Sequence, residues 1–337
     1  MNVLGIETSC DETSVAIVDE SGRVAVNLVS SQIARHQPYG GVVPEIASRA
    51  HLEIIDQLVS QAFDQSGLSP ADLSLVAATR GPGLASSLLI GLSYAKALSV
   101  SLDKPFVGVN HLHGHLLSPI LSGQIAPENL FPNVSLIVSG GHTILLHAQS
   151  AGSHRKIGAT VDDAAGEAFD KAAKLLGLDY PGGPLLDTYA RDGRPDAYDF
   201  PRGLSKNANF DFSFSGLKTA VRYFLAKQPE GFAAEHRADL CASIQEAICT
   251  VLVDKTIRAA LMTGVKTVTV SGGVSCNSRL RELFTGQCAR AGLLLHLCPP
   301  HFSTDNAAMI ALVAAWESTH EGLSDGIHDD IAPNLGF

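Results

Sequence analysis

The motif Val-Ser-Gly-Gly occurs twice in the chain, in Val138-Ser-Gly-Gly-His142 and in Val270-Ser-Gly-Gly-Val274, and this repeat decides the fold. Each follows a β-branched run and ends it in two glycines, which can turn sharply and admit another group close to the backbone. Successive backbone N–H groups at such a turn form a concave site for phosphate oxygens. A related polar loop, Gly5-Ile-Glu-Thr-Ser-Cys-Asp-Glu-Thr13, separates two apolar runs. One Gly-Gly turn is equally compatible with an ordinary turn, but three such loops at strand ends indicate a nucleotide-handling site.

The sequence around the two turns repeats one order of elements. Each half predicts three short strands joined by polar turns, followed by helices that alternate with further strands. The predicted strands are residues 3–6, 15–18, 24–29, 73–79, 106–109, 134–138, 143–147, 156–160, 267–270 and 293–297. The sequence predicts one helix that starts at residue 44, a second that ends at residue 97 and a last one that starts near residue 306. Three further helices are predicted at about residues 163–176, 240–262 and 278–291.

This duplicated pattern predicts an α/β protein built from two similar domains around a cleft. We place the boundary at residue 130, so that residues 1–130 form the first half and carry the histidines that could bind a metal. Residues 131–337 form the second half and carry the two Ser-Gly-Gly loops. The last helix belongs to the second half in sequence but can pack back on the first.

Composition narrows the class of protein. The 337 residues are 45% hydrophobic and 17% charged, which is typical of a globular chain. The net charge of −10 argues against a general basic surface for nucleic acid, so such a partner would need a local basic patch or a helper subunit. Six cysteines without Cys-x-x-Cys spacing indicate reduced thiols. With no cationic leader and no uncharged run long enough to span a bilayer, we expect a cytoplasmic protein without membrane contact.

A histidine cluster, Asn110-His-Leu-His-Gly-His115, follows a predicted strand. His111 and His115 are four residues apart, so both face one side if a helix begins there. That spacing suits two imidazoles on one metal ion. For an isolated pair, ordinary polar histidines at a strand end are the favoured interpretation, and His113 would point away from such a site.

The internal repeat strengthens the metal interpretation. Aligning the two halves matches the segment after Val109 with the segment after Leu297, which contains Asp305. We expect these two segments to face each other across the cleft, with Asp305 as the third ligand and His301 as a weaker candidate. Two histidines and one carboxylate leave positions open on the metal, as in non-haem iron and catalytic zinc sites.

A metalloprotease is a minor alternative on the residues alone. The zinc-protease signature places a glutamate general base directly after the first histidine of His-Glu-x-x-His. The residue after His111 is Leu112, so this base is missing.

The full set of motifs resembles the TsaD family of tRNA N6-adenosine threonylcarbamoyltransferases, which includes Kae1-, Gcp- and YgjD-like proteins once described as O-sialoglycoproteases. The resemblance covers residues 2 to about 310 in order and spacing. It rests on the motifs at residues 5–13, 40–45, 111–115, 138–143, 162–184, 212–218, 271–277 and 303–306.

The resemblance implies a duplicated actin/Hsp70/sugar-kinase-like (ASKHA, RNase H-like) fold. It also implies transfer of a threonylcarbamoyl group from threonylcarbamoyl-AMP to N6 of adenosine 37 in tRNAs that read ANN codons. One divalent metal per chain is expected, with Fe²⁺ favoured and Zn²⁺ the alternative, and ATP or ADP can occupy the same site. The implied partners are tRNA, a TsaB-like paralogue, a TsaE-like ATPase and a TsaC/Sua5-like enzyme that supplies the adenylate.

The resemblance also assigns roles to individual positions. The implied metal ligands are His111, His115 and Asp305. The implied substrate contacts are Ile137, Val138, Ser139, Gly140, Gly141, Asp170, Gly183, Asp187 and Asn277.

The residue types suit this chemistry. A metal can offset charge as the phosphate departs, and backbone amides of the Ser-Gly-Gly turn can hold that phosphate. Asp170 and Asp187 can accept hydrogen bonds from ribose hydroxyls, and Asn277 can cap a helix. The attacking exocyclic amine must lose a proton, for which Asp11 and Glu12 are the candidate bases. Without the family resemblance, each of these acids would be read as a turn or solvated residue.

Three alternating aromatic residues, Phe210, Phe212 and Phe214, predict a strand with one aromatic face. Core packing is the favoured interpretation, and stacking on a tRNA base is the alternative.

Three alternative functions stay open at this point. A small-molecule kinase would need Mg²⁺ on an acidic loop and contacts to β- and γ-phosphates, and it has no use for a two-histidine site. A metal-dependent glycoprotease and a non-enzymatic nucleotide-binding scaffold remain further alternatives. Stoichiometric iron or zinc would argue against the kinase. Loss of tRNA modification in His111→Ala and Asp305→Ala, with partner binding intact, would argue against the scaffold.

Overall fold

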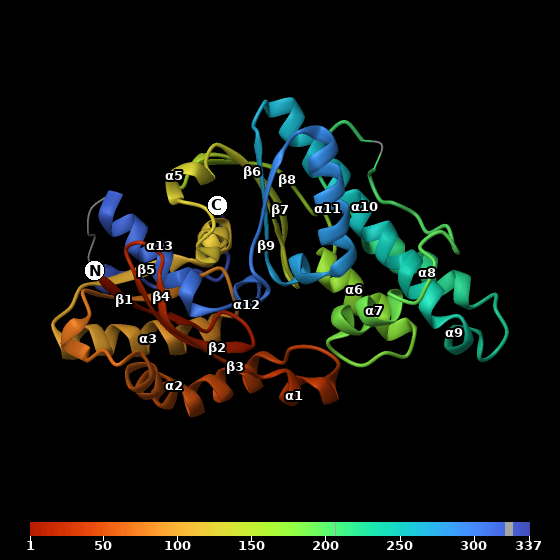
Figure 1. The fold of residues 1–337 in the computed structure, drawn as a ribbon. Helices are drawn as coiled ribbons and strands as arrows, with labels where there is room; N and C mark the ends of the chain where they lie inside the picture. The colour runs from red at the N-terminus through yellow and green to blue at the C-terminus, as the bar shows by residue number, and fades with distance from the viewer. Residues whose placement is uncertain (206, 321–325) are drawn as a thin grey trace. The chain divides into compact units, whose positions relative to one another are not determined.

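The computed structural model describes residues 1–205, 207–320 and 326–337. The chain divides into two compact units, and each contains one five-stranded sheet with helices packed against it (Figure 1). Unit 1 comprises Met1–Ala126 and His301–Phe337, and unit 2 comprises Pro127–Pro300.

Unit 1 has the strand order β3-β2-β1-β4-β5, in which β1–β3 are antiparallel neighbours and β4 and β5 run parallel to β1. Its strands are β1 (Asn2–Glu7), β2 (Glu12–Asp19), β3 (Val24–Ser31), β4 (Leu75–Gly81) and β5 (Phe106–Asn110). Its α-helices are α1 (Ile33–His36), α2 (Pro44–Ser66), α3 (Ala85–Leu102), α4 (His111–Leu117) and α13 (Ala307–His320), and α12 (Pro300–Ser303) begins at the end of unit 2. Short 3-10 helices cover Gln37–Tyr39, Pro70–Asp72, Ser118–Ser122 and Gly326–His328.

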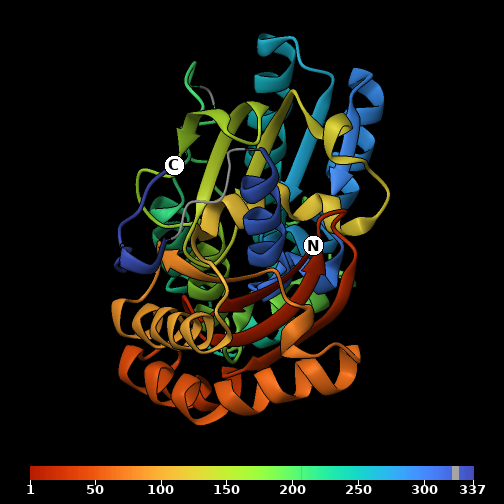
Figure 2. The same ribbon diagram turned by 90° about the vertical axis from the view of Figure 1, so that its left-hand side faces the viewer.

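Helices cover both faces of the unit 1 sheet. Figure 2 shows α2 and α3 on one face and α13 on the other. Because both faces are covered, β1 is apolar and buried along almost its whole length. Residues 307–315 of helix α13 are apolar all round and buried, as expected for a helix segment enclosed by the core. It approaches β1 at Gly5, where a Cβ atom would lie 2.6 Å from the carbonyl oxygen of Ala307.

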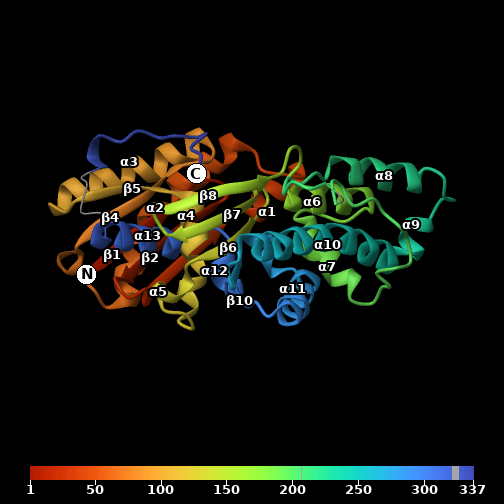
Figure 3. The same ribbon diagram turned by 90° about the horizontal axis from the view of Figure 1, so that it is seen from above.

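Unit 2 repeats this topology with the strand order β10-β9-β6-β7-β8. Its strands are β6 (Asn133–Val138), β7 (Thr143–Ser150), β8 (Ser153–Ala159), β9 (Thr267–Ser271) and β10 (Leu294–Leu297). Its helices are α5 (Pro127–Leu130), α6 (Ala165–Leu175), α7 (Gly182–Ala190), α8 (Ser215–Leu225), α9 (Phe232–Glu235), α10 (Arg237–Thr263) and α11 (Ser278–Ala291), with a 3-10 helix at Gly273–Cys276. The long helix α10 packs against β6 and β9 and is flanked by α7 and α11 (Figure 3).

The two sheets confirm the predicted duplication, because each joins an antiparallel three-stranded meander to two parallel strands in the same order. The predicted division at residue 130 needs a correction. Residues 301–337 belong to unit 1, and the first crossing to unit 2 lies at residue 127. The last helix, α13, packs back on β1 and β2, the arrangement that the sequence pattern left open. The physical reason is the burial of α13, whose apolar surface is covered by the unit 1 sheet.

Two local predictions also change. Helices α7 and α8 have no counterpart among the predicted helices. The aromatic run around Phe212 forms no strand and makes only an isolated bridge with Thr160. Phe212 and Phe214 are buried in the core of unit 2, with rings stacked 6.3 Å apart, so the core-packing interpretation is confirmed.

Among the described residues, α3 is the one helix long and apolar enough to cross a membrane by length and composition. This is weak evidence, since core helices of soluble proteins pass the same test. In unit 1, α3 packs against β4 and α2.

Candidate active site

The histidine pair is positioned by a helix cap. Strand β5 ends at Asn110, whose Oδ1 accepts a hydrogen bond from the backbone N–H of Leu112 at 2.9 Å. This cap starts α4 at His111 and satisfies one of the free N–H groups of the first turn. His111 and His115 therefore lie one turn apart on the same face, with ring centroids separated by 4.8 Å.

Asp305, just before α13, completes a cluster with these two histidines. Its Oδ1 lies 3.2 Å from Nε2 of His115 and 3.5 Å from Nε2 of His111. Close packing of α4 against α13 brings the carboxylate there: a Cβ atom on Gly114 would lie 2.9 Å from Cγ of Met309. The ligand atoms of the three residues all lie within 4.8 Å of one another.

The cluster fits a metal ion. Two nitrogen or oxygen ligands on one tetrahedral ion at about 2.1 Å lie roughly 3.4 Å apart, which matches the two distances to Asp305. His115 is fully buried, and its Nε2 lies within ion-pair distance of Asp305 but without hydrogen-bond geometry. A buried polar atom without a partner is costly, and a bound cation would satisfy it.

One expectation about this cluster is wrong. Asp305 was expected to face the histidines from the opposite half of the protein. The structure places all three residues in unit 1, because the chain returns to that unit after Pro300. The neighbouring histidines do not join the cluster: Nδ1 of His113 lies 3.7 Å from a carboxylate oxygen of Glu317, and His301 is exposed.

Acidic groups surround the histidine pair. Burial alone would lower the pKa of His111, but Asp305 and Glu7 raise it to about 9. Burial raises the pKa of Glu12 well above its usual value, and Asp305 and Asp11 raise it further. Both candidate bases, Asp11 and Glu12, therefore lie in unit 1 near the cluster, in a field that favours a cation.

The first Ser-Gly-Gly turn lies at the carboxyl end of β6. Ile137 and Val138 are buried in the strand. Ser139 closes the turn by donating its N–H to the carbonyl of His142 at 2.8 Å. Gly140 and Gly141 are exposed, and no atom lies within 4 Å of where their Cβ atoms would be. The backbone of this turn is thus open to a ligand.

The other predicted substrate residues hold the helix ends of unit 2 together. Oδ1 of Asp170 accepts the N–H groups of Gly182 and Gly183 at 2.8 and 3.0 Å, which anchors the start of α7 to α6. Asp187 accepts the N–H and hydroxyl of Ser278 at 3.2 and 2.6 Å. Asn277 caps α11 through Leu280 at 3.0 Å, as its position before the helix predicted.

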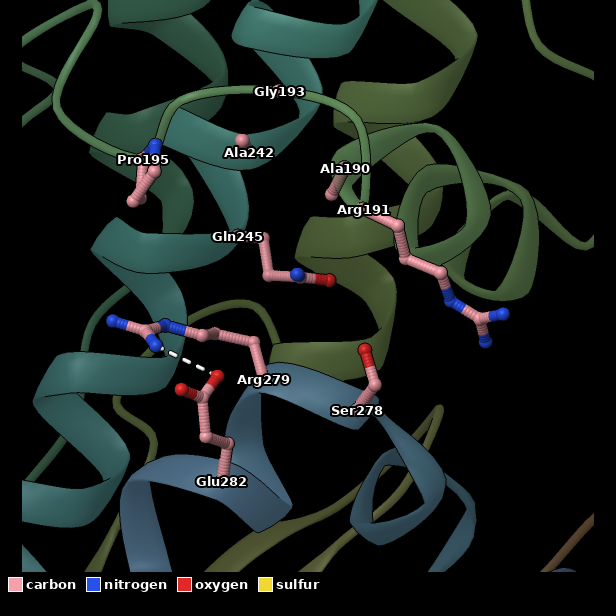
Figure 4. Close-up of a pocket in the computed structure, with 9 residues that line it drawn as sticks. All are labelled: Ala190, Arg191, Gly193, Pro195, Ala242, Gln245, Ser278, Arg279 and Glu282. Atoms are coloured by element: carbon pink, nitrogen blue, oxygen red, sulfur yellow. Dashed lines mark hydrogen bonds and ion pairs between the residues drawn. The ribbon is translucent and has the colours of Figure 1, made fainter. Parts of the chain in front are cut away.

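A cavity of about 320 Å³ adjoins this network in unit 2 (Figure 4). It is lined by Ala190, Arg191, Gly193, Pro195, Ala242, Gln245, Ser278, Arg279 and Glu282. Gln245 accepts a hydrogen bond from Asn277 at 2.6 Å, and Arg279 pairs with Glu282 and with Glu246, each at 2.7 Å. Sequence reasoning missed these residues, although Arg191 and Ser278 are close in sequence to the predicted Asp187 and Asn277.

The fold and the cluster define a duplicated α/β protein of the actin, Hsp70 and sugar-kinase class that carries a candidate metal centre. Among solved structures, the chain is similar to full-length HypF in its phosphate- and nucleotide-bound form, with a TM-score of 0.60 and 13% identity over 96% of this chain and 47% of that one. It is also similar to component A of (R)-2-hydroxyglutaryl-CoA dehydratase from Acidaminococcus fermentans, with a TM-score of 0.53, 13% identity and coverage of 95% and 99%. These likenesses support the fold alone.

Sequence comparison defines the family. The family model described as "TsaD: tRNA N6-adenosine threonylcarbamoyltransferase" matches residues 23–312. Relatives named tRNA N6-adenosine threonylcarbamoyltransferase include those of Kosmotoga olearia, 50% identical over 100% of this chain and 99% of the relative, and Geotalea uraniireducens, 49% identical over 99% and 96%. The chain belongs to the TsaD family and is a transferase. The glycoprotease and kinase alternatives are not favoured.

Proposed function

We propose that this chain transfers the threonylcarbamoyl group of threonylcarbamoyl-AMP to N6 of adenosine 37 in tRNAs that read ANN codons. The observation that carries the proposal is the buried cluster of His111, His115 and Asp305 in a chain that matches its family over nearly full length. Both histidines direct Nε2 at the same carboxylate oxygen of Asp305, which is the arrangement that a shared cation requires.

The three cluster residues would hold one divalent cation through two imidazole nitrogens and a carboxylate oxygen. This donor set suits Fe²⁺, which we favour, and Zn²⁺ is the alternative. Bound there, the ion would act as a Lewis acid that stabilises negative charge on the oxygens of the donor. Helix α4 and the packing of α13 keep the ligands together.

Unit 2 supplies the residues for the nucleotide part of the donor. The open backbone at Gly140 and Gly141 would donate N–H groups to the adenylate phosphate, where charge grows as AMP departs. The carboxylates of Asp170 and Asp187 are fixed by backbone N–H groups, so they would meet ribose hydroxyls in a defined orientation. The neighbouring cavity has a volume suited to a small ligand such as a nucleoside, and ATP or ADP would compete there.

Asp11 and Glu12 are the proposed bases for the amine of the tRNA. Burial raises the pKa of Glu12, which would make its carboxylate a stronger proton acceptor once ionised. Single-turnover transfer with pre-formed adenylate separates the two. An unchanged rate in Glu12→Gln would remove Glu12 from the mechanism.

The proposed setting is the cytoplasm, with tRNA as the acceptor. Since the chain carries a net charge of −10, we propose that tRNA is held jointly with partner proteins. The proposed partners are a TsaB-like paralogue and a TsaE-like ATPase, and a TsaC/Sua5-like enzyme would supply the adenylate.

The test is reconstitution with synthetic threonylcarbamoyl-AMP, unmodified tRNA, the partner proteins and Fe²⁺ or Zn²⁺, with nucleosides read by mass spectrometry. We expect threonylcarbamoyl-adenosine with the wild-type chain and none with His111→Ala. His113→Ala is the matched control, because His113 lies on the same helix outside the cluster. Equal activity of all three proteins would overturn the proposed metal role, and no product with any of them would overturn the proposed reaction.

A further inference from the structure

One buried carboxylate near the metal cluster, Glu7, is neither a proposed metal ligand nor a proposed base. Glu7 is the last residue of β1 and is fully buried. A carboxylate in the interior of a protein is costly unless several donors satisfy it. Its presence in the central strand of unit 1 therefore calls for partners, and the structure provides them.

The two oxygens of Glu7 accept hydrogen bonds from three groups. Oε1 accepts the backbone N–H of Ser9 at 2.5 Å. Oε2 accepts the hydroxyl of Thr79 at 2.7 Å and faces Nδ1 of His111 at 2.9 Å. Glu7, Thr79 and His111 lie at the carboxyl ends of the neighbouring strands β1, β4 and β5, so the parallel register of the sheet brings them together.

These bonds select one form of His111. An ionised carboxylate only accepts hydrogen bonds, so Nδ1 of His111 must carry the hydrogen. In the neutral ring the lone pair then resides on Nε2, the nitrogen that faces Asp305. Metal-binding histidines commonly donate their other N–H to a carboxylate in this way, which fixes the tautomer and the ring orientation.

The two histidines of the cluster differ in this respect. Nδ1 of His111 has the Glu7 carboxylate at 2.9 Å and the Ser9 hydroxyl at 3.3 Å, whereas Nδ1 of His115 has no hydrogen-bond partner among the described residues. Removing the Glu7 carboxylate should therefore alter the tautomer and orientation of His111 alone, while all three residues that bind the metal are still present.

We propose that Glu7 is a positioning residue that holds His111 in the Nδ1–H form with Nε2 directed at the metal. The inference rests on the proposed metal site and extends it to a residue that does not itself bind the ion. Loss of such an outer partner typically weakens metal binding about 10- to 100-fold.

The experiment measures Zn²⁺ and Co²⁺ dissociation constants of the full chain by competition with a chromophoric chelator. Glu7→Gln should bind about 10- to 100-fold more weakly than wild type, with a changed visible spectrum of the Co²⁺ form. Lys255→Met is the matched control for lost stability, because Lys255 is a buried charged residue of unit 2 that donates to the carbonyls of Asn209 and Asp211. Its metal affinity should equal that of wild type.

A second measurement covers the case in which Glu7→Gln does not fold. Nitrogen NMR of histidine-labelled, Zn²⁺-loaded wild type should show His111 protonated on Nδ1. Protonation on Nε2, or a folded Glu7→Gln with wild-type affinity and Co²⁺ spectrum, would overturn the role of Glu7. If His115→Ala nevertheless loses the metal, the proposed site stands and only Glu7 fails. If His115→Ala and Asp305→Asn both bind like wild type, both proposals fail.

Discussion

The carboxyl edges of the two sheets have the same topology and different chemistry. In unit 1 the edge carries Glu7, Thr79 and His111, a buried acid and imidazole linked by hydrogen bonds. In unit 2 the corresponding strand ends carry the two Ser-Gly-Gly turns, which offer backbone groups and few charges. The duplicated fold thus determines where a site can form, and the residues at each edge decide which ligand it takes.

The two Ser-Gly-Gly turns differ in the same way. Gly140 has open space around its Cβ position. Gly272 has a φ of +88°, and a Cβ there would meet the carbonyl of Val138. The first turn has room for a side chain at its glycines, whereas the second needs glycine for its own backbone.

The largest expected effect separates the two edges. Asp305→Ala should lose the bound metal and reduce transfer on the order of 1,000-fold, because a catalytic metal contributes several kcal/mol, while binding of the adenylate persists. Asp187→Ala should weaken adenylate binding and keep the metal. Metal analysis and calorimetric titration with a non-hydrolysable adenylate analogue measure both. If either variant lost both the metal and the adenylate, the sites at the two sheet edges would not be independent.

A smaller effect distinguishes the two turns. Gly272→Ala should destabilise the protein by about 2 kcal/mol or more, since it combines a left-handed backbone with a clash against Val138. Gly140→Ala should change the free energy of unfolding by less than about 0.5 kcal/mol and act on adenylate affinity instead. Urea unfolding monitored by circular dichroism measures the difference. Equal stability of the two variants would contradict the structural role of Gly272.

The smallest effect is a pH dependence in unit 2. Burial alone would raise the pKa of Asp162, but hydrogen bonds from Ser213, Phe214 and Ser215 lower it below its usual 3.8. A lowered folded-state pKa stabilises the protein above the unfolded pKa, and this stability is lost as pH falls through the folded value. Asp162→Asn should therefore unfold at a lower temperature than wild type at pH 7, and the gap should close below about pH 4. A gap that is constant with pH would contradict this assignment.

Local patterns predicted much of the fold and some of the candidate site. The β-branched runs and Gly-Gly turns predicted both sheets, and the four-residue spacing of His111 and His115 predicted that they share a helix face. These signals lie within a few residues of one another, where periodicity and capping act. Helix α7 was missed because its start is held by Asp170, twelve residues earlier, and its motif is rich in glycine and proline.

The sequence by itself determined the duplicated α/β fold, the family, and the types of residue available to bind a metal and a nucleotide. The tertiary structure alone decided that Asp305 joins the histidines within one unit, that Glu7 faces Nδ1 of His111, and that Arg279 lines the cavity beside Asn277. Strand and helix patterns arise from neighbouring residues. The partner of a buried charge depends instead on packing between distant segments, as with Glu7 and His111, which are 104 positions apart, and no local pattern records it.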